Sequence, residues 1–72
     1  MTEQEKLQSI ADSVEMEAEE LQKDMILADL ENWDSVAVLS IIAVINENFN
    51  RFPSAEEIMS YKTIGDLMDA MK

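Results

Sequence analysis

The stretch Trp33-Asp34-Ser35-Val36 opens an apolar run from Val36 to Ile45, and the conformation of this run decides the fold. Its Val and Ile content alone would favour a β-strand. A helix is favoured because Asp34 and Ser35 are good capping residues, because no helix breaker occurs before Asn50, and because no other segment offers a convincing partner strand. Four residues also continue one stripe at helical spacing: Val38, Ile42, Ile45 and Phe49. We therefore expect a helix over this run.

Ser35 would lie in the first turn of that helix, where free backbone N–H groups and the positive end of the helix dipole favour an anion. A hydroxyl at this place can be an ordinary cap or the attachment point of a phosphate-linked group. The Asp-Ser pair by itself is a weak motif, and a helix cap is its default interpretation.

Helical patterns also flank the apolar run. Three pairs have the spacing of a capping box, and each precedes a helical pattern: Thr2 with Glu5, Ser54 with Glu57, and Thr63 with Asp66. The first helix is expected to end near Val14 to Met16, and the short helix after Ser54 near Ser60. The last helix is expected to repeat apolar residues on one face: Ile64, Leu67, Met68 and Met71.

Residues 17–34 give a mixed signal. Leu21, Met25 and Ala28 would share one face of a helix, but the other two leucines of the segment fall elsewhere. A compact domain rarely contains so long a loop without any structure, so we expect at least a helical turn around Glu19 to Lys23.

Residues 50–53 are expected to form a turn from which Phe52 returns to the core. Together the elements predict an all-α fold, a small bundle of three main helices plus one short helix around one core. The chain contains no repeat, low-complexity tract or linker, so residues 1–72 are expected to form a single domain.

The charge balance is strongly acidic, with 16 acids against 5 bases and a net charge of −11. Residues 1–34 hold 11 acids and 2 bases (net −9), whereas residues 35–72 hold 5 acids and 3 bases (net −2). We therefore expect no nucleic acid and no anionic membrane as partner, and expect basic patches on other proteins instead. No segment approaches the ~20 apolar residues of a membrane span, and the acidic N-terminus lacks a signal-peptide layout, so a cytoplasmic protein is expected.

The composition also limits the chemistry. The chain has no cysteine and no histidine, which removes thiol chemistry, the commonest general base and the commonest metal ligand. Ser35 has no base in the sequence that could activate it as a nucleophile. We expect no catalytic residue and no metal site, and hence a protein that is not an enzyme.

The expected central helix is apolar in nearly every direction. After one face is assigned to the core, further residues remain for other directions: Val36, Ala37, Leu39, Ser40, Ala43 and Val44. Such a helix is either unusually central in the fold or presents an apolar docking surface, and both interpretations stay open.

The whole layout resembles an acyl carrier protein. The features occur in order along essentially the full chain: an acidic first helix, a long loop closing with Asp29-Leu30, Trp33-Asp34-Ser35, an apolar helix ending at Phe49, Phe52-Pro53, and Lys62-Thr63-Ile64-Gly65-Asp66-Leu67. This resemblance implies an acyl-carrier-like bundle in which Ser35 carries a 4′-phosphopantetheine arm. A separate phosphopantetheinyl transferase, which recognises Asp34, would attach the arm from coenzyme A.

The resemblance further implies a stand-alone carrier in fatty acid, polyketide or related specialised biosynthesis. The thiol of the arm would hold an acyl or aminoacyl thioester for loading and downstream enzymes with basic or mixed apolar docking patches. The residues expected to meet these partners are Asp34, Val36, Ala37, Leu39, Glu47, Glu56 and Glu57. Candidates for the family's apolar cargo cleft along the second and third helices are Leu39, Ala43, Ile58 and Met59. We expect a monomer.

The sequence departs from the family pattern at three places. Val36 replaces the usual leucine after the serine, and Glu31 and Asn32 stand where a glycine is common. Ala37 and Ser40 stand where the family shows acids to basic partner patches. These departures favour a specialised carrier with a dedicated partner.

The alternative is a helical adaptor that keeps the carrier fold, is never modified, and works only through protein contacts. An adaptor has no need of Asp34 and Ser35, and both residues are present, so the sequence favours the carrier.

Overall fold

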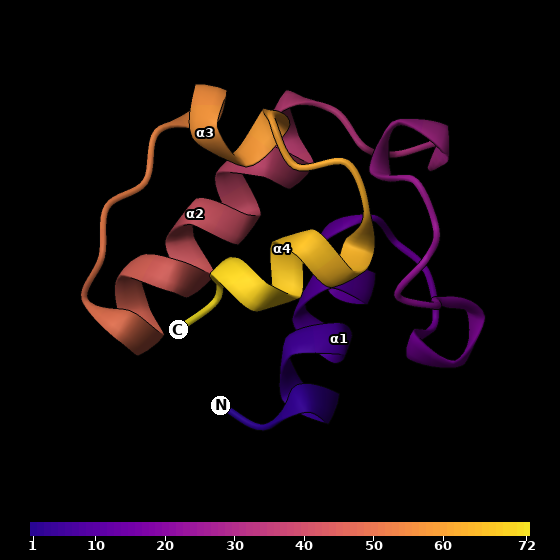
Figure 1. Cartoon of the computed structure of the whole chain (residues 1–72), viewed down its shortest axis with the longest axis horizontal. Coiled ribbons are helices and arrows are strands. Elements are labelled where there is room, and N and C mark those ends of the chain that lie inside the picture. Colours follow the sequence, from indigo (N-terminus) through magenta and orange to yellow (C-terminus); the bar gives the residue numbers. More distant parts are fainter.

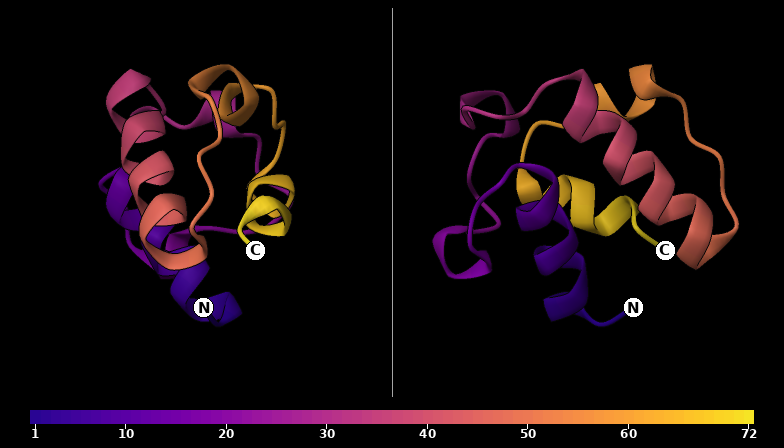
Figure 2. Two further views of the ribbon diagram at one scale, coloured as in Figure 1. Left: turned by 90° about the vertical axis from the view of Figure 1, so that its left-hand side faces the viewer. Right: turned by 180° about the vertical axis from the view of Figure 1, so that it is seen from behind.

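A computed structural model describes residues 1–72 and shows a helical bundle (Figures 1 and 2). It contains four α-helices: α1 (Glu3–Ser13), α2 (Ser35–Phe49), α3 (Ala55–Met59) and α4 (Ile64–Ala70). Helix α2 packs against α1 and α3, and α4 also contacts α1. No β-strand is formed, which confirms the all-α fold with three main helices and one short one. None of these helices has the length and apolar character needed to cross a membrane.

The core gathers apolar side chains from every helix and from the α1–α2 loop. Sixteen residues are buried: Ile10, Ala11, Val14, Ala18, Leu21, Leu27, Leu30, Ala37, Val38, Ile41, Ile45, Ile58, Ile64, Leu67, Met68 and Met71. No polar or charged residue is among them, so burial carries no desolvation penalty for charge.

The ends of α1 are closed by local hydrogen bonds. At the start, the Glu5 N–H donates to Thr2 Oγ1 (3.1 Å) and the Thr2 N–H donates to Glu5 Oε1 (2.8 Å), as the capping box predicts. At the other end the Met16 N–H donates to the Ala11 carbonyl across Glu15, whose φ is 57°. The helix ends at Ser13, about where the sequence predicts.

Helix α2 confirms the interpretation of the apolar run as a helix. Its buried face consists of Ala37, Val38, Ile41 and Ile45. Asn50 ends the helix in the left-handed region, with φ of 52° and its N–H on the Asn46 carbonyl, a conformation that asparagine tolerates well.

Helices α3 and α4 begin at their predicted caps. Ser54 Oγ accepts the Glu57 N–H (3.0 Å), but the return bond is absent, so this pair forms half of a capping box. Thr63 and Asp66 form both bonds at α4. The four residues predicted for the buried face of the last helix are indeed buried.

The α1–α2 loop contains two short 3₁₀ turns, η1 (Ala18–Glu20) and η2 (Leu27–Asp29). The predicted helical turn is therefore present, although it lies slightly earlier than the range 19–23. Leu21, Leu27 and Leu30 anchor the loop in the core, so the two leucines that fall off the helical pattern are buried together with Leu21, which lies on it.

Backbone hydrogen bonds tie this loop to the start of α4. The Ile64 N–H donates to the Met25 carbonyl (3.0 Å), and the Gly65 N–H donates to the Lys23 carbonyl (2.8 Å). In the other direction the Leu27 N–H donates to the Lys62 carbonyl (2.9 Å). A β-carbon at position 65 would lie 3.1 Å from the Lys23 carbonyl oxygen, so the close approach depends on glycine.

The expectation that Phe52 returns to the core is wrong, because its side chain is 76% exposed. The neighbouring Arg51 is also exposed, and it joins this segment to the end of α4. Its guanidinium donates to the carbonyls of Ala70, the last residue of α4 (2.9 Å), and Lys72 (3.1 Å). The segment is thus fixed by a polar contact that leaves the aromatic ring outside.

Candidate functional site

Ser35 is the first residue of α2 and is exposed. The capping role falls to its neighbour: Asp34 Oδ1 accepts the Ala37 N–H (3.0 Å), and the Asp34 carbonyl accepts the Val38 N–H (3.0 Å). The Ser35 hydroxyl therefore does not cap the helix, and it makes no hydrogen bond within the chain.

Of the other five serines of the chain, four differ from Ser35 in this respect. These four use their hydroxyls locally, in α1 or around α3: Ser9, Ser13, Ser54 and Ser60. Ser40 has no hydrogen-bond partner either, but it is half-buried in the middle of α2. Ser35 is thus the only exposed serine with a free hydroxyl.

The backbone beside this hydroxyl offers two donors. The N–H groups of Ser35 and Val36 have no acceptor within the chain, whereas the next two N–H groups of α2 are bound by Asp34. Free N–H groups at the positive end of a 15-residue helix favour a bound anion. The surroundings of Ser35 therefore suit a phosphate ester on its oxygen.

The start of α2 is held in place by the residues that precede it. Trp33 is half-buried against the core, and its N–H donates to the carbonyl of buried Leu30 (3.2 Å). The Asn32 side-chain amide donates to the Val14 carbonyl at the end of α1 (3.2 Å). The sequence marks Asn32 only as a replacement for a common glycine, so this bridge between α1 and the site was not anticipated.

The site contains no histidine or lysine that could act as a general base for the hydroxyl. Residues 24–50 include no lysine, arginine or histidine, and the single ion pair of the chain joins Lys23 to Glu3. The two side chains whose pKa values are shifted lie elsewhere in the chain. Burial and a hydrogen bond to Glu57 raise the pKa of Tyr61, and hydrogen bonds to Thr2 lower the pKa of Glu5. The site therefore presents the Ser35 hydroxyl without a histidine or lysine beside it.

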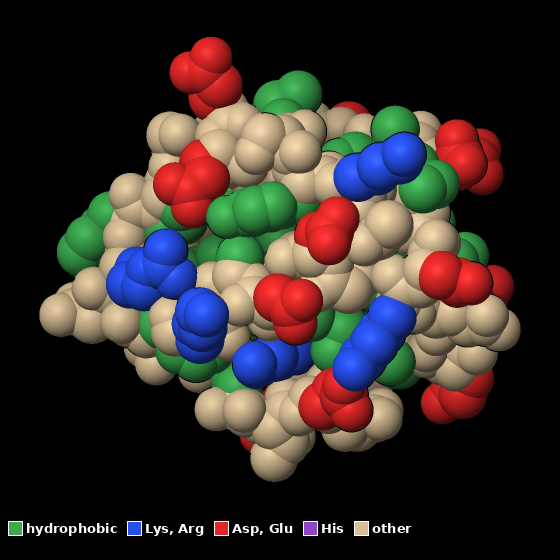
Figure 3. Space-filling model, in the orientation of Figure 1, with side chains coloured by type: hydrophobic (Ala, Val, Ile, Leu, Met, Phe, Trp, Pro, Cys, Tyr) green, Lys and Arg blue, Asp and Glu red, His purple; other side chains and the backbone are tan.

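The charge on the surface is unevenly distributed. In Figure 3 acidic side chains line the right-hand side, over the α1–α2 loop, and others lie over α3 and across the centre of the view, while apolar side chains reach the surface along the upper and left-hand edges. No group of three or more potential metal-ligating side chains comes together.

Most of the residues predicted to meet partners are exposed: Asp34, Val36, Leu39, Glu47, Glu56 and Glu57. Ala37 is the exception. It is 1% exposed and belongs to the buried face of α2, so its assignment to a docking surface is wrong. The pattern misled because the helix is apolar on all sides, and the sequence alone does not say which side faces the core.

The predicted cargo cleft is not open in this structure. Ile58 is completely buried in the core, whereas Leu39 and Met59 are each 62% exposed and Ala43 is also exposed. These four residues line neither of the two hollows of the molecule. Ile58 therefore packs in the core, and the assignment of these four residues to a cargo cleft stays a prediction.

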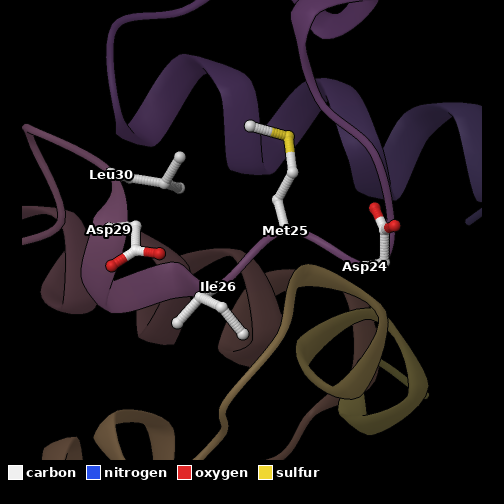
Figure 4. A pocket seen from close by; sticks show the side chains of 5 residues that line it. All are labelled: Asp24, Met25, Ile26, Asp29 and Leu30. Atoms are coloured by element: carbon white, nitrogen blue, oxygen red, sulfur yellow. The ribbon is translucent and has the colours of Figure 1, made fainter.

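Both hollows lie beside the α1–α2 loop. One, of about 370 Å³, is lined by Asp24, Met25, Ile26, Asp29 and Leu30. Figure 4 shows the Met25 side chain reaching toward α1, with the two aspartates on either side of it. The other, of about 380 Å³, shares Met25, Asp29 and Leu30 and extends to the end of α1.

A helical bundle that holds one free serine hydroxyl at the start of a helix has the architecture of a carrier domain. The family model described as the phosphopantetheine attachment site matches residues 5–71, nearly the whole chain. The chain therefore belongs to this family of acyl-carrier-type proteins, whose prosthetic group is 4′-phosphopantetheine. Comparisons with curated proteins and with solved structures gave no significant match.

Proposed function

We propose that this protein is a stand-alone acyl carrier and that Ser35 is the residue that holds the 4′-phosphopantetheine arm. The observation that carries the proposal is the free, exposed Ser35 hydroxyl at the start of α2, in a chain whose other exposed serines are engaged locally. The family match supplies the prosthetic group but does not name the residue.

The attachment step is a phosphoryl transfer. The Ser35 Oγ attacks the phosphorus that bears the pantetheine in coenzyme A, a P–O bond to the nucleotide breaks, and adenosine 3′,5′-bisphosphate leaves. The serine proton passes to a base of the phosphopantetheinyl transferase, since the chain has no histidine of its own. The product is a phosphodiester on Ser35.

The residues around Ser35 fit this product. The free N–H groups of Ser35 and Val36 lie on the same turn as the ester and can donate to its anionic oxygen. Asp34 keeps its carboxylate exposed while one oxygen caps the helix, so the same side chain can also be read by the transferase.

When attached, the arm supplies a terminal thiol that holds an acyl or aminoacyl group as a thioester. The carrier itself contributes the anchor, the surface that its enzymes recognise, and no catalytic group. We place it in fatty acid, polyketide or a related specialised biosynthesis, acting as a cytoplasmic monomer with dedicated loading and downstream enzymes.

The test is the intact mass of the purified protein after incubation with coenzyme A and a broad-specificity phosphopantetheinyl transferase. We expect a gain of one phosphopantetheine in the wild type and no gain in Ser35→Ala. Ser40→Ala is the matched control, because Ser40 is the other serine without a hydrogen-bond partner, and it should be modified normally.

A folded wild-type protein that gains no mass would overturn the proposal and favour the unmodified adaptor. A mass gain that persists in Ser35→Ala would move the attachment to another residue. Circular dichroism of each variant confirms that the helices are retained.

A further inference from the structure

Asn32 joins the loop before Ser35 to the end of α1. Its side-chain amide donates to the Val14 carbonyl at 3.2 Å, across 18 positions of sequence. Val14 follows the last residue of α1 and is completely buried, and its carbonyl accepts no backbone N–H. The last carbonyls of a helix lack partners within the helix, so the Asn32 amide supplies a partner that the backbone does not.

Packing alone does not fix this part of the loop. A hollow of about 380 Å³ lies between it and the end of α1, and both Val14 and Asn32 belong to its lining. Glu31 and Asn32 are exposed, and residues 31–33 make only one other hydrogen bond, from the Trp33 N–H to the Leu30 carbonyl. Because neither residue 31 nor residue 32 has a buried apolar side chain, the Asn32 amide is what ties this stretch to α1.

The position of this stretch bears directly on Ser35. Asn32 precedes Ser35 by three residues, and Asp34 between them caps the helix. Ser35 and Val36 lie in the first turn of α2, where their own N–H groups have no acceptor and where a helix frays most readily. A contact that holds the chain just before this turn therefore limits the directions in which the hydroxyl can point.

Resting on the function proposed above, we infer that Asn32 is a positioning residue for the attachment of phosphopantetheine at Ser35. It makes no hydrogen bond to Ser35, and it acts by holding the chain that presents the hydroxyl. A displacement of about 1 Å between reacting atoms can cost about 100-fold in rate. In the family pattern a glycine is common where Glu31 and Asn32 stand, and a glycine has no side chain that could form this bridge.

A positioning role predicts which kinetic constant changes. Helices α2 and α3 keep their own buried residues in the core when the bridge is lost, so the surface that the transferase binds stays in place. Only the fraction of complexes with a correctly placed hydroxyl falls. We therefore expect kcat to decrease while KM stays nearly constant.

The experiment measures kcat and KM of a broad-specificity transferase for the wild-type carrier, Asn32→Ala and Asn32→Asp. Aspartate has the shape of asparagine, but its carboxylate cannot donate to the Val14 carbonyl, so the two variants should behave alike. We expect kcat to fall about tenfold in both, with KM within about twofold of the wild type. Circular dichroism confirms that each variant keeps its helices.

Trp33 provides a second readout that does not depend on the reaction. It is the only tryptophan of the chain, follows Asn32 directly, and is half-buried against the core. Without the bridge the loop moves more freely, so acrylamide should quench the fluorescence of Trp33 more strongly in both Asn32 variants than in the wild type.

Thr2→Ala is the matched control for a loss of stability. It removes the cap at the opposite end of α1 and leaves the contact between Asn32 and Val14 intact. We expect this variant to unfold at lower urea concentration than the wild type, but to keep the wild-type kcat, KM and quenching of Trp33.

The possible failures are distinguishable. If the wild type is not modified at all, the proposed function fails, and the positioning role fails with it. If Ser35 is modified but the Asn32 variants keep the wild-type kcat, or raise KM at unchanged kcat, only the positioning role is overturned. An equal fall of kcat in Thr2→Ala would overturn it as well, because lower stability alone would then explain the effect. Unchanged quenching of Trp33 in both Asn32 variants would show that the bridge does not hold the loop, and would have the same consequence.

Discussion

At the scale of single residues, Asp34 caps α2, although a serine at the start of a helix can itself be the cap. The Asp34 carboxylate accepts the Ala37 N–H at 3.0 Å, which satisfies a donor that would otherwise lack a partner. The Ser35 hydroxyl is then free for chemistry. Local sequence allowed either residue to be the cap, and only the geometry shows which of them is.

Replacement of Asp34 separates capping from recognition. Asp34→Ala should lower the free energy of unfolding by about 1 kcal/mol, because the Ala37 N–H loses its acceptor. Asp34→Asn keeps an acceptor oxygen and should lose much less, while a transferase that reads the carboxylate should modify it more slowly. Urea unfolding and the modification rate measure the two effects, and equal stability of both variants would contradict the capping role.

Glu5 gives a prediction for pH. Hydrogen bonds from the Thr2 backbone and side chain favour its charged form and lower its pKa below the ordinary 4.5. Its charge therefore contributes stability that is present above pH 4.5 and is lost as the pH falls through the lowered pKa. Glu5→Gln keeps the capping-box pattern without the charge. The stability difference between wild type and Glu5→Gln should shrink below pH 4.5 in urea unfolding, and a constant difference would contradict the assignment.

At the scale of elements, the end of α1 contains an unfavourable residue at a special backbone position. Glu15 adopts φ of 57°, in the left-handed region where glycine is usual, while the Met16 N–H closes the helix on the Ala11 carbonyl. Glu15→Gly should raise the free energy of unfolding by about 0.5–1 kcal/mol, because the strain of a side chain is removed. Asn50→Gly is the control and should gain less, since asparagine tolerates its φ of 52°. Thermal unfolding of both variants tests whether Glu15→Gly gains more stability than Asn50→Gly.

The elements that sequence predicts well are those specified by neighbouring residues. Thr2 with Glu5 and Thr63 with Asp66 form the predicted capping boxes, and the stripe through α2 correctly outweighs its β-propensity. The α1–α2 loop could not be derived in this way. Its conformation depends on backbone bonds to residues 62–65, and no local pattern records contacts at such separation.

The same distinction applies to the candidate site. Ser35 could be singled out from its place before an apolar helix, but the Asn32 bridge to Val14 joins residues 18 positions apart. The burial of Ala37 depends likewise on how α2 packs against the other helices, and the exposure of Phe52 on a segment that Arg51 joins to the end of α4 at the surface. Sequence therefore indicates the candidate attachment residue, and tertiary packing decides the surface around it.

At the scale of the whole molecule, the contact between the loop and α4 depends on Gly65. A β-carbon there would lie 3.1 Å from the Lys23 carbonyl oxygen and 3.3 Å from the Lys23 β-carbon. Gly65→Ala should lower the free energy of unfolding by about 1 kcal/mol, although the same change in a free helix would add about that amount. Asp69→Ala, at an exposed position of α4, is the control and should not destabilise. Equal stability of the two variants in urea would show that the loop moves aside at no cost.

The bonds between the loop and α4 also set an order of events during synthesis. The carbonyls of Lys23 and Met25 accept hydrogen bonds from the N–H groups of residues 65 and 64, which leave the ribosome about forty residues later. Contacts of such sequence separation form late, so the loop that leads into α2 settles only when nearly all of the chain has emerged. In a nascent chain the loop that leads to Ser35 would therefore not yet be fixed in place. A modifying enzyme that recognises the folded surface would act on completed chains rather than on growing ones.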